Sequence, residues 1–192
     1  MKTLKNIDKD WTLFLDRDGV INVRPVNNYV KNIAEFIFIE GVPEAIKTLN
    51  NIFKYTFIVT NQGGINKELM TEQNLAEIHG FMTEQLIKNS AKVDDIFFCP
   101  FRAEENHFLR KPNPGMALQA KKKYPDIQFK KSVMVGDSMS DMMFGKKLKM
   151  LTVFISPDIK EARQYPRLID YSFKTLSEFQ NTLVDSLYPG HN

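Results

Sequence analysis

The residues best suited to catalysis or metal binding are two carboxylates, Asp16 and Asp18, which stand just after the apolar run Leu13–Leu15. In an open sheet of parallel strands, ligands bind in the crevice beyond the carboxyl ends of the strands. Two acids this close raise each other's pKa or attract a cation, and their hard oxygen atoms favour Mg²⁺. Because Gly19 comes next, an ordinary Asp-Gly turn that closes the strand explains this segment alone equally well.

Three further motifs place polar side chains where an apolar run ends or a helix is expected to begin. They are VTNQGG at 59–64, with Thr60 and Asn61; RKP at 110–112, with two adjacent cations; and VMVGDSMSD at 133–141, with Asp137 and Asp141. Each has an ordinary explanation, because turns favour Asn and Gly, loops expose Arg and Lys, and Asp caps helices.

All four motifs are expected along one rim of one sheet, because each follows an expected strand or precedes an expected helix. There they would gather four carboxylates, a hydroxyl, an amide and two cations around one crevice. Carboxylates can hold a metal ion, and donors and cations can hold an oxyanion; phosphoryl transfer requires both. The arrangement therefore favours phosphoryl-transfer chemistry over four unrelated turns.

Short apolar runs alternate with segments of helical periodicity along the chain. The expected strands are apolar at successive positions, as in strands covered on both faces, and lie at 12–15, 56–60, 95–98, 132–135 and 151–155, with a closing strand near 170–173. Helices are expected at 42–53, 71–88 and 113–124, and Thr71 and Asn113 are the expected N-caps of the second and third. A final helix is expected to follow a capping box formed by Thr175 and Glu178. The interval 22–41 is expected to be a loop with a short extended piece at 35–39. This alternation predicts a doubly wound, mainly parallel α/β sheet with helices on both faces and no large cap domain.

The composition is that of an ordinary globular protein in a reducing compartment. With 192 residues, 43% of them apolar, the chain is expected to form one domain spanning 1–192. A net charge of +3 is too small to indicate a nucleic-acid partner. The single cysteine, Cys99, excludes an intramolecular disulfide, no apolar run is long enough to span a membrane, and the first ten residues lack the core of a signal peptide. We therefore expect a cytoplasmic, monomeric protein without a membrane or nucleic-acid partner.

The order of these motifs resembles the haloacid dehalogenase superfamily of aspartate-nucleophile phosphatases. The segments DRDGVIN, IVTNQGGI, RKPNPGM and VMVGDSMSD are similar in particular to the branch of heptose-1,7-bisphosphate and histidinol-phosphate phosphatases, over roughly residues 11–156. The resemblance implies a Mg²⁺-dependent phosphatase of carbohydrate metabolism that hydrolyses a small phosphomonoester through an aspartyl-phosphate. D-glycero-D-manno-heptose 1,7-bisphosphate is the favoured substrate, ahead of histidinol phosphate.

The resemblance also implies roles for the polar residues of the motifs. Asp16 is the implied nucleophile and Asp18 the acid and base, and both, with Asp137, are implied Mg²⁺ ligands. The residues implied to hold the phosphoryl oxygens are the catalytic Thr60 and Lys111 and the substrate-binding Arg110. The remaining positions are Asn22, Asn61 and Gln62, which match substrate-binding positions, and Asp141, which is expected to orient the site from behind the metal ligands.

A zinc site that is frequent in that branch is not expected here. Between the CP and RKP motifs its members often carry cysteines and a histidine, but this chain offers only Cys99 and His107. Two ligands cannot complete a tetrahedral structural zinc site. Cys99 is interpreted as a packed residue, His107 as an exposed loop residue, and His79 as a packed residue on a helix.

Other functions remain open on the sequence alone. A site without a cap could take histidinol phosphate or a nucleic-acid 3′-phosphate end, although no basic and aromatic strip favours nucleic acid. A signalling receiver, a non-enzymatic phospho-acceptor of related fold, also clusters acids near its first strand. Against a receiver, the Asp-x-Asp spacing supplies an acid and base beside the nucleophile, and Arg110-Lys111 precedes the last acidic motif. Repeated turnover of an aryl phosphate with Mg²⁺ would distinguish an enzyme from a receiver.

Overall fold

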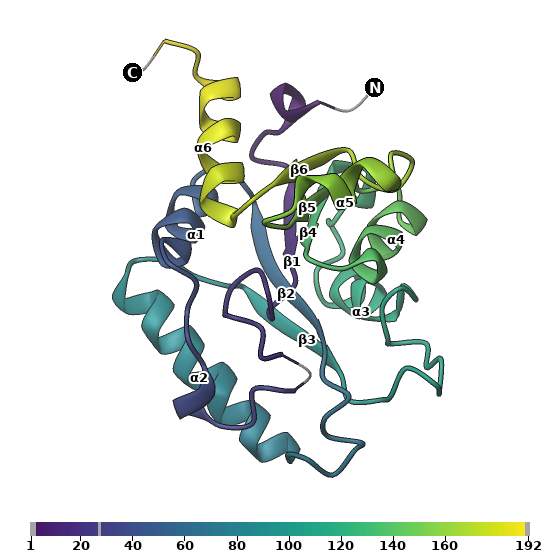
Figure 1. Ribbon diagram of the computed structural model, residues 1–192. Helices are drawn as coiled ribbons and strands as arrows, with labels where there is room; N and C mark the ends of the chain where they lie inside the picture. Colours follow the sequence, from purple (N-terminus) through teal and green to yellow (C-terminus); the bar gives the residue numbers. More distant parts are fainter. Residues whose placement is uncertain (1–2, 27, 191–192) are drawn as a thin grey trace.

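Parallel strands form the central sheet in the computed structural model, which describes residues 3–26 and 28–190 (Figure 1). The strands are β1 (Thr12–Leu15), β2 (Tyr55–Asn61), β3 (Asp95–Cys99), β4 (Ser132–Gly136), β5 (Leu151–Ile155) and β6 (Tyr171–Phe173). They lie in the order β3-β2-β1-β4-β5-β6, and every neighbouring pair is parallel. Every expected strand is present, including the closing strand near 170–173.

Helices cover both faces of this sheet. They are α1 (Val42–Asn50), α2 (Glu72–Lys88), α3 (Gly115–Lys123), α4 (Met139–Lys147), α5 (Ile159–Gln164) and α6 (Leu176–Leu187), with 3₁₀ turns η1 (Leu4–Asn6), η2 (Ile33–Glu35) and η3 (Phe129–Lys131). In Figure 1, α1, α2 and α6 lie on one side of the sheet and α3, α4 and α5 on the other. The predicted doubly wound α/β fold is confirmed, whereas one domain over 1–192 stays a prediction. No helix in the described ranges is long and apolar enough to cross a membrane.

The side chains of β1 show why Leu13, Phe14 and Leu15 are apolar at successive positions. Leu13 and Leu15 are fully buried in the core with residues of α1, α2 and α6, whereas Phe14 enters a second core with residues of α3 and α4. There Phe14 meets Phe57 of β2, with ring centroids 5.5 Å apart. Successive strand residues face opposite sides of a sheet, so a strand covered on both faces leaves no position for an unpaired polar side chain. The first charged residue, Asp16, comes where β1 ends.

The strand order places the carboxyl ends of β1 and β4 next to each other. The chain runs outward from β1 to β3 and then returns to add β4 on the other side of β1. The ladder continues one residue beyond β1, where the Asp16 N–H donates to the Val135 carbonyl at 2.9 Å. At such a reversal the two following loops diverge and leave a crevice between them. Asp16 and Asp18 therefore lie on one side of this crevice and Asp137 on the other.

Two helix boundaries differ from the predictions, and α5 was not predicted. α1 ends at Asn50 rather than at 53, and α3 begins at Gly115 rather than at 113. Asn113 does not cap α3, because its side-chain amide donates to the carbonyls of Asn106 and His107 in the preceding loop. The Asn-Pro signal was therefore misread, since the asparagine holds a loop instead of a helix end.

Two local predictions are half correct. At α6, Thr175 accepts from the Glu178 N–H as expected, but the Glu178 carboxylate accepts from the Lys174 N–H rather than from that of Thr175. Of the expected extended piece at 35–39, only Phe38 pairs, in an isolated bridge with Asn22. That bridge holds the loop after β1 against the chain leading to α1.

Candidate active site

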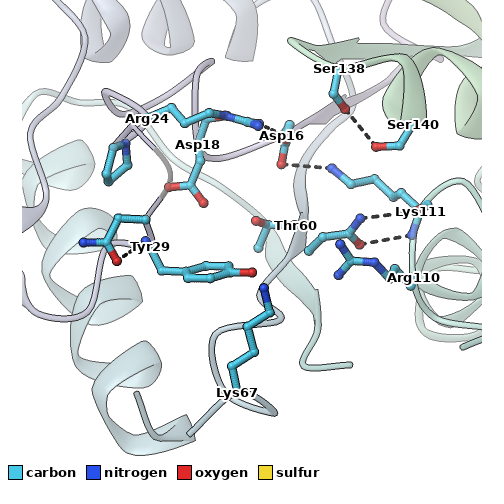
Figure 2. A pocket seen from close by; sticks show the side chains of 13 residues that line it. Asp16, Asp18, Arg24, Tyr29, Thr60, Lys67, Arg110, Lys111, Ser138 and Ser140 are labelled. Carbon is cyan, nitrogen blue, oxygen red and sulfur yellow. Dashed lines mark hydrogen bonds and ion pairs between the residues drawn. The ribbon is translucent and has the colours of Figure 1, made fainter. Parts of the chain in front are cut away.

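A pocket of about 560 Å³ opens at the carboxyl ends of β1, β2 and β4 (Figure 2). Its lining combines two acids with four cations, and the charged lining residues are Asp16, Asp18, Arg24, Lys67, Arg110 and Lys111. Thr60 and Asn61 from the end of β2, Tyr29 from the loop after β1, and Ser138 beside β4 also line it. The predicted motifs are thus brought to one rim.

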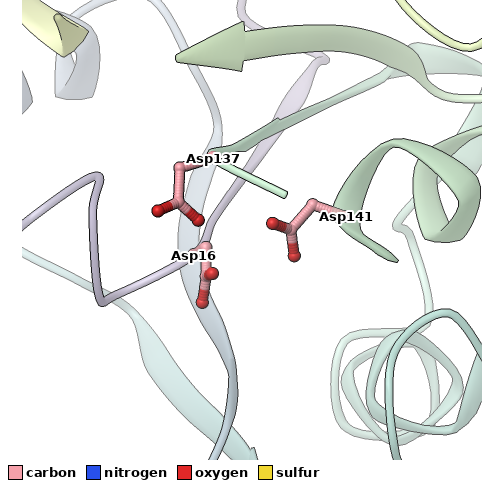
Figure 3. A group of neighbouring side chains, drawn as sticks. All are labelled: Asp16, Asp137 and Asp141. Carbon is pink, nitrogen blue, oxygen red and sulfur yellow. The ribbon is translucent and has the colours of Figure 1, made fainter. Parts of the chain in front are cut away.

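Three carboxylates, those of Asp16, Asp137 and Asp141, crowd together beside the pocket (Figure 3). One oxygen of each lies within 4.8 Å of the others. Gly19 permits this approach, because a Cβ there would lie 1.8 Å from an Asp137 oxygen, and its φ of +88° also suits glycine. Burial raises the pKa of Asp16 to about 6 and that of Asp137 to about 8, and repulsion from neighbouring acids adds to both shifts. The charged forms of these acids therefore need cations beside them.

Lys111 is the buried cation of this cluster, with a side chain only 1% exposed. Its Nζ lies 2.9 Å from Asp16 Oδ1 and 2.6 Å from Asp141 Oδ1, and it donates to the Val59 carbonyl at 2.7 Å. Burial lowers the pKa of Lys111, but the two carboxylates outweigh it and hold the pKa above its usual value. Asn61 and the Lys111 backbone exchange two hydrogen bonds, at 3.0 and 3.1 Å. The ammonium is therefore held, charged, against Asp16.

Asp141 lies behind the other two acids, in the first turn of α4. Its Oδ2 accepts from the Ser138 N–H at 3.0 Å and from the Ser138 hydroxyl at 2.6 Å, while Oδ1 pairs with Lys111. Ser138 is the N-cap of α4, so Asp137 does not cap the helix and its carboxylate faces the other acids. This position, behind the metal ligands, is the one expected of a residue that orients the site, and that role stays a prediction.

The carboxylate of Asp18 is held by several donors. Arg17 Nη2 lies 2.9 Å from Oδ1 and 3.0 Å from Oδ2, while Asn22 and Gln62 each donate at 2.9 Å. Burial opposes ionisation of Asp18, but Arg17 and the hydrogen bonds outweigh it and hold its pKa below the usual value. Asn22 and Gln62 are 0% exposed, so their side chains hold Asp18 instead of lining the pocket. Their predicted direct contact with substrate is therefore revised to the positioning of Asp18.

Arg17, between the two acids, is fully buried and connects Asp18 to α2. Its Nη1 lies 3.2 Å from His79 Nε2. Because a guanidinium only donates, this nitrogen accepts and the imidazole is neutral. Burial and the nearby Arg17 charge lower the pKa of His79 to about 3. The predicted packed position of His79 is confirmed. Its contact with Arg17 could not be predicted from the sequence, because that contact depends on where α2 lies relative to β1.

Replacing His79 by glutamine is expected to flatten the dependence of stability on pH. The unfolded chain binds a proton on His79 near pH 6.5 and the folded protein only near pH 3, so the wild type loses stability as the pH falls below 6.5. Between pH 7.5 and 5 this residue accounts for a loss of about 2 kcal/mol in the free energy of unfolding. Glutamine can still accept from Arg17 but does not titrate. Urea unfolding at both pH values should show the smaller loss in His79→Gln; equal losses would contradict a buried neutral imidazole.

A second cation, Arg24, reaches the acids from the loop after β1. Its Nη2 lies 2.5 Å from Asp137 Oδ1, 3.0 Å from the carbonyl oxygen of Asp18 and 3.6 Å from Asp16 Oδ2. Burial lowers the pKa of Arg24, but Asp137 and Asp16 outweigh it and raise the pKa. Arg24 stands outside the four motifs, so sequence reasoning missed it.

The three oxygens around Arg24 fit a divalent metal ion. Two are carboxylate oxygens and one is a main-chain carbonyl, which is the donor chemistry that Mg²⁺ prefers. They belong to Asp16, Asp137 and Asp18, the residues predicted as metal ligands. The buried acids Asp16 and Asp137, whose pKa values are raised by crowding, gain most from such a charge.

The other cations of the pocket stand further from the acids. Arg110 Nη1 donates to the Phe101 carbonyl at 2.8 Å, and Lys67 Nζ lies 5.5 Å from the centre of the Tyr29 ring (Figure 2). Sequence reasoning predicted Arg110 but not Lys67 or Tyr29.

Thr60 is 1% exposed and lines the pocket. Its hydroxyl oxygen accepts a hydrogen bond from the buried side-chain amide of Gln62.

The loop after β3 differs from its prediction at one residue. Cys99 is fully buried, as expected, and burial raises the pKa of its thiol. His107 is half-buried rather than exposed, because its ring stacks on Phe101 at 3.7 Å between centroids and its Nδ1 accepts from the Leu109 N–H at 3.1 Å. The absence of structural zinc stays a prediction.

Comparison with known proteins finds relatives for most of the chain. Residues 10–179 match the polynucleotide kinase 3 phosphatase family. The chain is 34% identical over 173 residues to the D-glycero-alpha-D-manno-heptose-1,7-bisphosphate 7-phosphatase of Campylobacter jejuni, which covers 90% of this chain and 95% of that one. It is 40% identical over 138 residues to the D-glycero-beta-D-manno-heptose-1,7-bisphosphate 7-phosphatase of Vibrio cholerae, with 68% and 73% covered. The structure of a D,D-heptose 1,7-bisphosphate phosphatase from B. bronchiseptica, complexed with magnesium and phosphate, superposes with a TM-score of 0.82 at 27% identity, over 91% of this chain and 98% of that one.

Proposed function

The chain belongs to the polynucleotide kinase 3 phosphatase family, within the haloacid dehalogenase superfamily. From its likeness to the heptose-1,7-bisphosphate 7-phosphatases we propose that it hydrolyses the 7-phosphate of a D-glycero-D-manno-heptose 1,7-bisphosphate. It is a phosphoric monoester hydrolase. The observation that carries the proposal is the placement of Asp16 in the pocket wall, with Lys111 at one carboxylate oxygen and Asp137 nearby. Relatives are named for both the α and the β anomer, so the anomer is left to experiment.

In the proposed first step, Asp16 attacks the phosphorus of the 7-phosphate. A bond forms between a carboxylate oxygen and phosphorus while the bond from phosphorus to the C7 oxygen breaks, which gives an aspartyl-phosphate and an alcohol. Lys111, 2.9 Å from Asp16 Oδ1, stabilises the negative charge that gathers on the phosphoryl group. Thr60 and Arg110 line the same pocket and are proposed to hold phosphoryl oxygens.

Asp18 is proposed to move the protons in both steps. It donates a proton to the departing C7 oxygen and then, as a carboxylate, accepts one from the water that attacks the aspartyl-phosphate. Arg17, Asn22 and Gln62 hold Asp18 ionised, which suits the second step. The first step needs the protonated form, and the negative charge of an entering phosphate raises the pKa of a neighbouring carboxyl in that direction.

Asp16, Asp137 and the carbonyl of Asp18 are the proposed ligands of Mg²⁺. When bound, the ion neutralises charge between these acids and the phosphate. The similar B. bronchiseptica phosphatase, complexed with magnesium and phosphate, supports this choice of ion. The side chain of Asp141 remains with Lys111 and Ser138, so it is proposed to orient the site without ligating the metal.

The shape of the substrate suits a pocket that has its nucleophile inside and cations along its wall. The 7-phosphate is an ester of a primary alcohol at the end of a short chain, so it can reach a recessed nucleophile with little steric hindrance. The 1-phosphate is attached to the ring at the other end of the molecule. Lys67, Arg24 and Arg110 line the pocket as candidate partners for this second dianion.

A substrate panel tests the proposed function. The two anomers of heptose 1,7-bisphosphate should be hydrolysed in the presence of Mg²⁺ with kcat/KM on the order of a hundredfold or more above histidinol phosphate, sugar monophosphates and a DNA 3′-phosphate oligonucleotide. Phosphate release with and without EDTA is the measurement. A different substrate far ahead of both anomers would overturn the heptose proposal, and a protein that binds Mg²⁺ but turns over nothing would favour a receiver.

Metal analysis of the purified protein is expected to find less than stoichiometric zinc. The loop after β3 supplies Cys99 and His107, and His107 Nδ1 already accepts from the Leu109 N–H. A structural zinc site needs four protein ligands. One tightly bound zinc per chain, retained through dialysis against a weak chelator, would contradict this prediction.

We also propose that the enzyme is monomeric and cytoplasmic.

A further inference from the structure

Arg24 occupies a position that its neighbours suit to a metal ion. One nitrogen, Nη2, approaches Asp137 Oδ1 at 2.5 Å, the Asp18 carbonyl at 3.0 Å and Asp16 Oδ2 at 3.6 Å. These are the three oxygens proposed above as Mg²⁺ ligands. Figure 2 shows the Arg24 side chain extending across the pocket to Asp16. A magnesium ion at its usual distance of about 2.1 Å from the same oxygens leaves no room for the guanidinium nitrogen.

The two cations at Asp16 differ in how firmly they are held. Lys111 is 1% exposed and is bound on its ammonium and along its backbone. Arg24 is 48% exposed and comes from a segment with no helix or strand, beside Val23 and Val26, which are exposed as well. Breaking an ion pair whose cation is half exposed costs far less free energy than removing the cation of a fully buried pair. A competing divalent cation therefore displaces Arg24 and not Lys111.

A displaced Arg24 remains tethered at the pocket, where Lys67 is another exposed cation. Arg24 lines the pocket together with Lys67 and Arg110. Within the described residues its Nε and Nη1 make no hydrogen bond, so these donors are available to a ligand. A guanidinium with free donors binds phosphate through two parallel hydrogen bonds.

We propose that Arg24 is a tethered counter-cation: Mg²⁺ displaces it from Asp16, Asp137 and the Asp18 carbonyl, and the released guanidinium binds the phosphate that is not hydrolysed. The second half of this proposal rests on the bisphosphate function proposed above, and the first half does not. Because metal and Arg24 exclude each other, binding of the metal makes a phosphate-binding group available. The two ligands are thereby coupled through one side chain.

Metal affinity tests the displacement without any turnover. In the absence of substrate, Arg24→Gln should bind Mg²⁺ roughly fivefold to thirtyfold more tightly than the wild type, by isothermal titration calorimetry and by Mn²⁺ electron paramagnetic resonance. Lys67→Gln is the matched control, because it removes one positive charge from the same pocket but not from the metal oxygens. Its affinity should stay within about twofold of the wild type. Unchanged affinity in Arg24→Gln, or equal tightening in both variants, would overturn the displacement.

Substrate discrimination tests the second role of the guanidinium. With saturating Mg²⁺, Arg24→Gln should lose on the order of tenfold or more in kcat/KM for heptose 1,7-bisphosphate but little for heptose 7-phosphate. An equal loss on both substrates would overturn the phosphate-binding role. If neither substrate is hydrolysed by the wild type while Arg24→Gln still binds Mg²⁺ more tightly, the proposed function fails and the displacement stands.

Discussion

Replacing Lys111 by methionine is expected to lower the free energy of unfolding by about 3–5 kcal/mol at pH 7.5 and to abolish turnover. The ammonium is the buried partner of Asp16 and Asp141, at 2.9 and 2.6 Å. Methionine fills much of the same volume but leaves two buried carboxylates without their cation. The penalty should shrink at lower pH, because Asp16, whose pKa is raised to about 6, can then be protonated. Urea unfolding of the wild type and the variant measures it.

Two further variants make this prediction specific to the buried pair. Lys123→Met removes the exposed ion pair between Lys123, whose side chain is 62% exposed, and Asp95, and should leave the free energy of unfolding almost unchanged. Adding Asp141→Asn to Lys111→Met removes one of the stranded charges and should recover part of the lost stability without restoring activity. A loss in Lys111→Met no larger than that in Lys123→Met would contradict the buried ion-pair cluster.

Replacing Asp16 by asparagine is expected to reduce turnover at least about a thousandfold while leaving the fold intact. The amide has the shape of the carboxylate but cannot attack phosphorus. Burial raises the pKa of Asp16 to about 6, which means that its charged form opposes folding at neutral pH. Loss of the charge offsets the weakened contact with Lys111, so the melting temperature should stay within a few degrees of the wild type.

Asp10→Asn is the matched control for this loss of charge. Asp10 is an exposed acid whose carboxylate pairs with Lys131 at 2.9 Å, and the variant should keep the wild-type rate. Phosphate release and thermal unfolding are measured on all three proteins. A folded Asp16→Asn enzyme that retains the wild-type rate would remove Asp16 from the role of nucleophile.

The sheet could be predicted from the sequence because its strands are short apolar runs, and β1, β2 and β4 each end in a chemical motif. β1 stops being apolar at Asp16, and β4 stops at Gly136 and Asp137, so the pattern indicated both the strand and the edge where ligands bind. The start of α3 could not be predicted in the same way. A Cβ on Gly115 would lie 2.5 Å from the Phe108 carbonyl oxygen, so α3 begins in close contact with the loop that precedes it, and this contact had no signal in the sequence.

Within the site, sequence reasoning identified residues that belong to motifs and missed those that arrive through tertiary contacts. Thr60, Lys111 and Asp137 were found because each stands near the expected end of a strand or the expected start of a helix. Arg24 was not found, because it extends from an irregular loop, and the contact of His79 with Arg17 was not predicted, because it depends on how α2 packs beside β1. The burial of Gln62 could not be foreseen either, since neighbours in a turn look alike in sequence whether they face a pocket or the core.

The most direct test of the account is to follow ³¹P NMR spectra of heptose 1,7-bisphosphate during incubation with Mg²⁺ and either the wild type or Asp16→Asn. We expect the 7-phosphate signal to be replaced by one equivalent of inorganic phosphate in the wild-type sample, while the 1-phosphate signal persists. The Asp16→Asn sample should keep both signals. Loss of the 1-phosphate first, no change with the folded wild type, or equal rates in both samples would contradict the central claim.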